Sequence, residues 1–182
     1  MNTNLGNIRS RHVRSLLMVA GVVTMVAMSA GSASAESPAA IPQCNVNSLS
    51  LSLGGEEGAA SHILRTLLFT NVSGSSCSMQ GWPGVSFVAG DDGHQVGPAA
   101  ERFGTSNGPV ILAPGGVASV LTDSRSPDVY DPNVCQPTDV RGFRVYAPND
   151  TLALFVPLPA GSRACAAIQD LSVYPVQAGS GN

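Results

Sequence analysis

The chain of 182 residues contains no lysine, and its other charged and aromatic residues are few. Only 12% of the residues are charged and only 5% are aromatic. All 12 acidic residues lie at or after Glu36, whereas only six of the nine arginines do, so a chain starting at Glu36 would have a net charge of 6 − 12 = −6. An acidic domain without lysine repels phosphate backbones and anionic lipid. We therefore expect no binding to nucleic acid.

Common catalytic motifs are missing as well. The chain has no G-x-S-x-G sequence, and S-x-x-K is impossible without lysine. The only histidines after residue 35 are His62 and His94, and no serine is marked as a nucleophile beside either of them. The acidic pairs Glu56-Glu57 and Asp91-Asp92 are flanked by glycine, which indicates solvated turns rather than a glycosidase site.

Metal sites have little support in the sequence, and we expect no cofactor. The cysteines have no close C-x-x-C spacing, which a zinc site would need. One methionine after residue 35, Met79, and two histidines are too few for a soft-metal site. Calcium prefers several oxygen ligands, and the stretch "DSRSPDVYDPN" provides Asp123, Asp128 and Asp131 near one loop. Whether this loop binds an ion stays open, because its spacing matches no motif.

The first 35 residues have the pattern of an export signal. A basic segment at residues 9–14 precedes the uncharged apolar run of residues 15–30 and the small residues "ASA" at 33–35, which predicts cleavage between Ala35 and Glu36. A membrane anchor is the alternative, but a span needs about 20 apolar residues and this run has 16. Pro42 and Gln43 before Cys44 do not form a lipobox. We therefore expect a freely secreted chain with no membrane attachment after signal removal.

The rest of the chain reads as one β-sandwich domain. A linker at 36–43 precedes a domain at 44–176, and residues 177–182 are expected to be a flexible tail. Short apolar segments recur between glycine, proline and Asn-Asp turn signals, and no long helical period occurs. This pattern predicts a β-sandwich. The expected strands include "SLSLSL", "HILRTLLFTN", "GVSFVA", "PVIL", "GVASVLT", "RGFRVYA", "TLALFVP" and "DLSVYPV".

Two details of the first hairpin follow from the same pattern. The stretch "GGEEGAAS" at 54–61 is expected to be a turn between the first two strands. In the second strand, Ile63, Leu67 and Phe69 are expected to form the buried face, and Arg65 is expected to point outward.

Four cysteines in an exported chain predict two disulfides. Cys135 and Cys165 are centred on the expected Asn149-Asp150 turn, so a hairpin would bring them together at its open end. Cys44 and Cys77 are centred near Ala60, about three residues past the centre of the stretch "GGEEGAAS", and the residues "SGSS" before Cys77 can absorb that slack. We therefore predict Cys44–Cys77 and Cys135–Cys165. Each disulfide closes a loop of about 30 residues, worth roughly 3 to 4 kcal/mol in the chain-entropy model.

The uncharged stretch from Phe69 to Phe87 holds the single tryptophan. We expect it to be architectural: a strand ends, residues 71–76 turn the chain, and Cys77 anchors the turn. Trp82 would then cover an edge of the core, because large aromatic side chains mostly serve burial. The alternative is that Trp82 forms a platform for a ligand.

The order of these segments resembles domain-of-unknown-function family 4232. The resemblance rests on "LFTNVSGSSCSMQGWPGVSF", "ILAPGGVASVL" and "RGFRVYAP" between the cysteines, and it covers about Cys44 to Val176. It implies an immunoglobulin-like β-sandwich stapled by two disulfides, in a secreted or lipid-anchored actinobacterial protein. It implies no activity and no catalytic residues.

The expected function is that of a non-catalytic binding or interaction module at the cell envelope or outside the cell. Its partner would be an envelope or extracellular protein or a glycan. Two alternatives stay open: an extracellular hydrolase with an unmarked site on its loops, and a purely structural envelope protein. A pocket that holds His62 or His94 beside a carboxylate would favour the hydrolase, and a broad apolar patch would favour a partner interface.

Overall fold

The computed structural model describes residues 40–181. The predicted signal, its cleavage position between Ala35 and Glu36, and residues 36–39 of the expected linker lie outside these residues. Within 40–181, no helix is long and apolar enough to cross a membrane.

Strands dominate the described residues, and the two helical segments are one turn each. The strands are β1 (Leu49–Ala59), β2 (His62–Asn71), β3 (Cys77–Met79), β4 (Gly84–Ala89), β5 (His94–Val96), β6 (Glu101–Arg102), β7 (Val110–Leu112), β8 (Val117–Arg125), β9 (Pro137–Asp139), β10 (Gly142–Tyr146), β11 (Ala153–Pro157), β12 (Arg163–Cys165), β13 (Leu171–Val173) and β14 (Gln177–Ala178). The helical turns are η1 (Pro127–Val129) and α1 (Pro132–Cys135).

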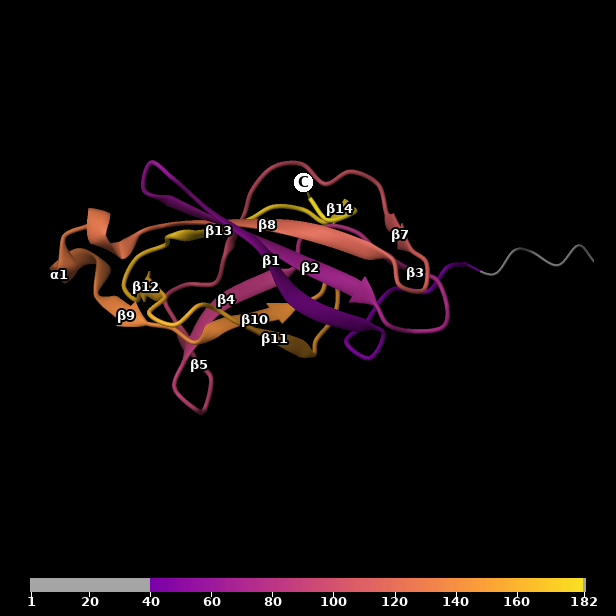
Figure 1. Ribbon diagram of the computed structural model, residues 1–182, viewed down its shortest axis with the longest axis horizontal. Helices are drawn as coiled ribbons and strands as arrows, with labels where there is room; N and C mark the ends of the chain where they lie inside the picture. Colours follow the sequence, from indigo (N-terminus) through magenta and orange to yellow (C-terminus); the bar gives the residue numbers. More distant parts are fainter. Residues whose placement is uncertain (1–39, 182) are drawn as a thin grey trace, which may run out of the picture. The chain divides into compact units, whose positions relative to one another are not determined.

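Two sheets form the layers of the domain (Figure 1). The larger has the order β1-β2-β8-β13-β6, with β14 paired to β8 beyond the end of β13. The smaller has the order β11-β10-β4-β5. Two short pairs, β9 with β12 and β3 with β7, lie at opposite ends of the domain in Figure 1. The prediction of an all-β chain with two disulfides is confirmed.

The core lies between the two sheets, and alternation places its side chains there. Leu67 and Phe69 of β2 are fully buried, as is Phe143 of β10. Phe87 of β4 lies opposite Phe143 in the strand register, and their ring centroids are 4.8 Å apart. Such aromatic pairs contribute beyond the area that they bury.

The first hairpin departs from the sequence prediction in two ways. β1 runs through the expected turn to Ala59, and the chain reverses at Ala60 and Ser61, which have positive φ values of 46° and 77°. The register shifts between Leu53 and Glu56, which is a β-bulge at the two glycines. The expectation for Arg65 is wrong: the residue is 3% exposed and lies on the buried phase of β2. Arg65 can be buried because the bulge brings Glu56 opposite it, which gives the guanidinium a charged partner.

Both predicted disulfides are present, Cys44–Cys77 and Cys135–Cys165. The second follows the predicted geometry, since β10 and β11 form a hairpin and β9 pairs with β12 beyond its open end. The first joins the segment before β1 to the start of β3, where Cys44 N donates to Ser78 O at 2.9 Å. The chain reversal at 60–61 lies at the midpoint of this cysteine pair, so no slack is needed.

The stretch from Phe69 to Phe87 has the predicted architecture. The buried Asn71 side chain organises its turn by donating to Ser75 O and Leu112 O, both at 2.9 Å. Trp82 packs against the edge of the core, and its Nε1 donates to Phe103 O at 2.8 Å. The prediction that Trp82 covers a core edge is confirmed.

The two ends of the domain are more ordered than expected. Gln43, in the expected linker, forms a parallel bridge with Ser78 of β3. At the other end, Gln177 and Ala178 of the expected flexible tail pair with β8 as β14, and Gly179 N donates to Val117 O at 2.9 Å. Both segments therefore belong to the folded domain.

Candidate functional site

A histidine–carboxylate pair forms on the outer face of the larger sheet. His62 begins β2, and Asp123 lies on the neighbouring strand β8. The antiparallel register sets Leu64 opposite Asp123 and His62 opposite Arg125, so the His62 ring can reach diagonally along the same face to Asp123. His62 Nδ1 lies 2.8 Å from Asp123 Oδ1, and the two side chains are 37% and 22% exposed. A carboxylate on Nδ1 fixes the orientation of the ring.

Further polar groups surround this pair and form a hollow of about 180 Å³, which we call the His62 hollow. Ser172 of β13 lies opposite Asp123 on one side and opposite Glu101 of β6 on the other, so all three occupy the same row of the sheet. The rest of the lining comes mainly from residues near the ends of β8 and β13, including Arg125, Tyr130, Gln169 and Asp170.

Asp170 is the electrostatically unusual group of the hollow. Burial raises the pKa of its carboxyl, and the nearby charge of Asp123 adds to the rise, while hydrogen bonds from Arg125 N at 3.1 Å and from the Tyr130 hydroxyl at 3.2 Å lower it. Its Oδ2 is buried and has no hydrogen-bond partner among residues 40–181. Burial, followed by the charge of Asp170, also raises the pKa of Tyr130. The hollow thus holds a carboxyl that gives up its proton less readily than an ordinary aspartate.

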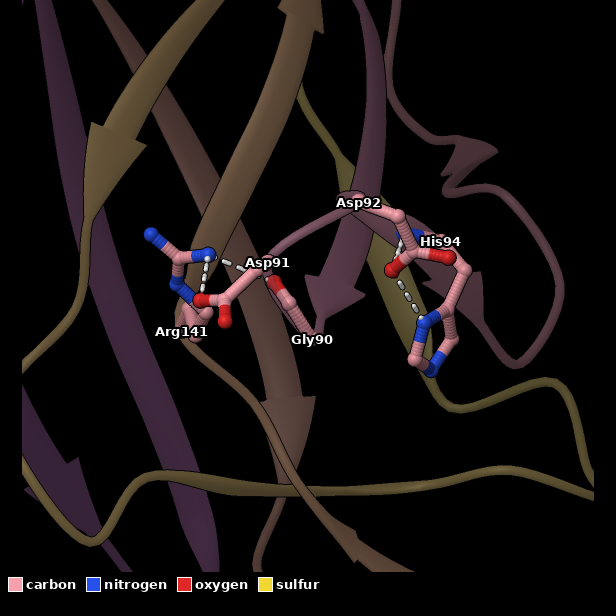
Figure 2. A network of polar contacts seen from close by, with 5 residues as sticks. All are labelled: Gly90, Asp91, Asp92, His94 and Arg141. Atoms are coloured by element: carbon pink, nitrogen blue, oxygen red, sulfur yellow. Dashed lines mark hydrogen bonds and ion pairs between the residues drawn. The ribbon is translucent and has the colours of Figure 1, made fainter.

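The second histidine forms a pair of a different kind in the β4–β5 hairpin (Figure 2). Asp92 Oδ1 lies 2.8 Å from His94 Nδ1, and the side chains of Asp92 and His94 are 74% and 56% exposed. The hydrogen bond from the His94 side chain is the main reason that the pKa of Asp92 is lowered. Beside them, Arg141 Nη1 donates to Gly90 O at 2.5 Å and to Asp91 Oδ1 at 3.2 Å. This agrees with the predicted solvated turn.

The three loop aspartates considered for calcium have separate roles. Asp123 belongs to β8 and contacts His62. Asp128 accepts from Arg163 Nη1 at 3.1 Å, and Asp131 caps α1 by accepting from Asn133 N at 2.8 Å. No group of three or more His, Cys, Asp or Glu side chains suited to a metal ion occurs within residues 40–181.

Sequence reasoning found His62 as a candidate but missed its partners. Asp123 is 61 residues away, and Asp170 and Tyr130 approach only because β13 pairs with β8. The sequence held one signal for Asp123. If the expected strand "GVASVLT" is continued past Thr122, alternation places the Asp123 side chain on the outer face of the sheet.

Residues 44–177 match the family described as a domain of unknown function (DUF4232). The chain belongs to this family. Neither the curated proteins nor the solved structures provide a match to the chain. The immunoglobulin-like topology therefore remains a prediction, and the DUF4232 description assigns no activity to the His62 hollow.

Proposed function

We propose that this DUF4232 protein is an exported, non-catalytic binding module that acts at the cell envelope or outside the cell. Two disulfides are compatible with an oxidising compartment. The leader pattern at 1–35 supports export, and N-terminal sequencing of protein from culture medium should begin at or near Glu36. Recovery of only the full-length chain from the membrane fraction would contradict export.

The His62 hollow is the observation that carries the binding proposal. Its polar groups come from several strands and hold one another in place through the His62–Asp123, Tyr130–Asp170 and Arg125–Asp170 hydrogen bonds. Such fixed donors and acceptors suit a ligand with many hydroxyl groups, which needs both. A glycan is the ligand class that fits best. Among residues 40–181, no serine hydroxyl is hydrogen bonded to His62, which favours the binding proposal over catalysis by a serine nucleophile there.

The test is a titration of the isotope-labelled domain with chito-oligosaccharides and soluble mannan, followed by amide NMR. Binding should shift Ser172 and Gln169, which line the hollow, more than the hairpin residues Gly90–Gly93. Asp123→Asn should weaken binding, and Asp92→Asn is the matched control because it alters the other histidine pair. If no glycan shifts the hollow while protein capture from envelope extract maps elsewhere, the glycan assignment is wrong.

An extracellular hydrolase is the second candidate, and Asp170 is the observation that favours it. A carboxyl of raised pKa close to a second carboxyl, Asp123, is the combination that acid-catalysed glycoside hydrolysis uses. Chromogenic glycosides provide the assay. Turnover that disappears in Asp170→Asn but persists in Asp92→Asn would replace the binding proposal with the hydrolase.

A further inference from the structure

A second cavity, of about 260 Å³, lies between the larger sheet and the segment at 159–163 that follows β11. We call it the Arg65 pocket. Its lining includes Ile63 and Arg65 of β2 and Glu56 of β1. Ser126, which follows β8, and Pro127, which begins η1, also line it. It shares none of its lining residues with the His62 hollow.

Arg65 is an unusual residue to find in such a pocket. Its side chain is only 4% exposed, although burying a charge is costly unless the charge is well paired. The bulge at Gly54 and Gly55 partly accounts for this, because it sets Glu56 opposite Arg65, and Arg65 Nε donates to Glu56 Oε2 at 2.6 Å. The register of the hairpin therefore holds the guanidinium in one orientation.

The pairing of this guanidinium is incomplete. Its Nη1 makes one long hydrogen bond, 3.4 Å to Ser124 Oγ, and its Nη2 has no hydrogen-bond partner among residues 40–181. Only two buried side-chain polar atoms in that range lack a partner, Arg144 Nε and Asp170 Oδ2. Arg65 Nη2 is not one of these two atoms, so it is not fully enclosed, and Arg65 is one of the residues that line the cavity. A guanidinium has five N–H donors, and only two of those on Arg65 are hydrogen bonded to residues 40–181.

A second arginine lines the same pocket. Arg163 Nη1 donates to Asp128 Oδ1 at 3.1 Å, and its side chain is 41% exposed. The Ser126 and Ser162 side chains add hydroxyl groups to the lining. Glu56 and Asp128 are counter-charges to the two arginines, so the four charged residues sum to zero, and the two carboxylates repel a dianion more strongly than a monoanion.

We propose that the Arg65 pocket binds a carboxylate group of a ligand. The planar fork of a guanidinium matches a carboxylate, and such charge-assisted bonds are stronger than neutral ones. A carboxylate is favoured over a phosphate dianion because of the nearby Glu56 and Asp128. Ile63, Pro127 and Pro159 provide apolar contacts for the carbon atoms that carry the group. The ligand can be an acidic sugar or a peptide with a free C-terminus. This site lies beyond the His62 hollow and does not depend on the function proposed for it.

The experiment follows the Arg65 side chain by NMR, using its Nε–Hε signal, during titration with millimolar probes. Glucuronate represents the acidic sugar, and acetyl-alanyl-alanine represents the peptide C-terminus. Glucose and the amide of the same dipeptide are their uncharged counterparts, and inorganic phosphate tests the charge preference. We expect the carboxylate probes to shift Arg65 and the Ile63 amide, with phosphate weaker and the uncharged probes inactive. Tighter binding of glucuronate would identify the ligand as an acidic sugar, and tighter binding of acetyl-alanyl-alanine would identify it as a peptide C-terminus.

Arg163→Gln should weaken carboxylate binding about tenfold, as expected when one charge-assisted hydrogen bond is lost. Arg141→Gln is the matched control, because Arg141 is also half-exposed and makes a single ion pair, with Asp91 at 3.2 Å, outside the pocket. Arg65→Lys keeps the charge and removes the fork, and should abolish binding while the amide spectrum shows an intact fold. The proposal is overturned if neither carboxylate shifts Arg65, if the uncharged probes bind equally well, or if the Arg163 and Arg141 variants behave alike.

Discussion

The two histidine–carboxylate pairs of this domain have the same length but different origins. His62 Nδ1–Asp123 Oδ1 and His94 Nδ1–Asp92 Oδ1 both measure 2.8 Å. The first pair joins residues 61 positions apart on neighbouring strands, whereas the second joins residues two positions apart in one turn.

The two pairs also differ in the polar groups that surround them. The His62 pair is assembled by the β2–β8 register, and the same sheet adds Ser172 and Glu101 to its row. The His94 pair needs only the local turn, and both of its side chains are more than half exposed. A short contact therefore does not by itself indicate a site. What distinguishes the His62 pair is the set of groups that tertiary structure places around it.

The largest effect is expected from breaking the local pair through its backbone. Gly90 has a φ of 62°, and an added Cβ would lie 2.6 Å from Asp92 Oδ1. Gly90→Ala should cost about 1 to 2 kcal/mol from the left-handed conformation alone. It should also displace Asp92 from His94, which a changed His94 ring signal in NMR would show. Gly93→Ala is the control, since Gly93 has a φ of 66° and open space at its Cβ. An unchanged His94 signal in Gly90→Ala would mean that the turn does not hold the pair.

The next effect concerns the two carboxylates themselves. Asp123→Asn should lower the free energy of unfolding by about 1 kcal/mol, because it weakens a partly buried, charge-assisted hydrogen bond between β2 and β8. Asp92→Asn, in the exposed turn, should lower the urea midpoint by less than Asp123→Asn does. Urea denaturation of both variants provides the measurement. Equal losses would remove the distinction between the two pairs.

A smaller effect is expected for the coupling within each pair. A double-mutant cycle with His62→Gln and Asp123→Asn should give a coupling of about 0.5 kcal/mol, typical of a pair that solvent partly screens. The corresponding cycle with His94→Gln and Asp92→Asn should give a smaller coupling, because solvent screens this exposed pair more strongly. A larger coupling in the turn than in the hollow would reverse the interpretation.

The smallest effects concern how stability depends on pH, where Asp170 of the hollow and Asp92 of the turn should act with opposite sign. The pKa of Asp170 is raised, so its contribution to stability is present below its unfolded value of 3.8 and is lost as pH rises through the folded pKa. Asp170→Asn should therefore gain stability relative to wild type as pH rises through that window toward neutrality. The pKa of Asp92 is lowered, so its contribution is present above 3.8 and is lost as pH falls through the folded pKa. Denaturation at acidic and neutral pH compares the two signs, and parallel profiles for both variants would contradict them.

Much of the fold could be predicted because it depends on local chemistry. Short apolar segments between glycine and proline turn signals identified the longer strands, and the Asn149-Asp150 turn signal located the β10–β11 hairpin. The cysteine spacing then gave both disulfides. The first turn was predicted too long because Gly54 and Gly55 read as its beginning, whereas they form a bulge and the chain reverses only at Ala60 and Ser61. Neither of these two residues is a usual choice for positive φ.

The sequence by itself determined that this DUF4232 chain is an acidic, all-β domain with two disulfides, since composition, alternation and cysteine spacing are properties of the chain alone. Only the tertiary structure decided which polar groups from different strands meet. Strand register brought Asp123 to His62, and the β1 bulge brought Glu56 to Arg65. The physical reason is that a shift of one residue moves every side chain of a strand to the opposite face, so a site built across strands depends on pairings that no local segment encodes.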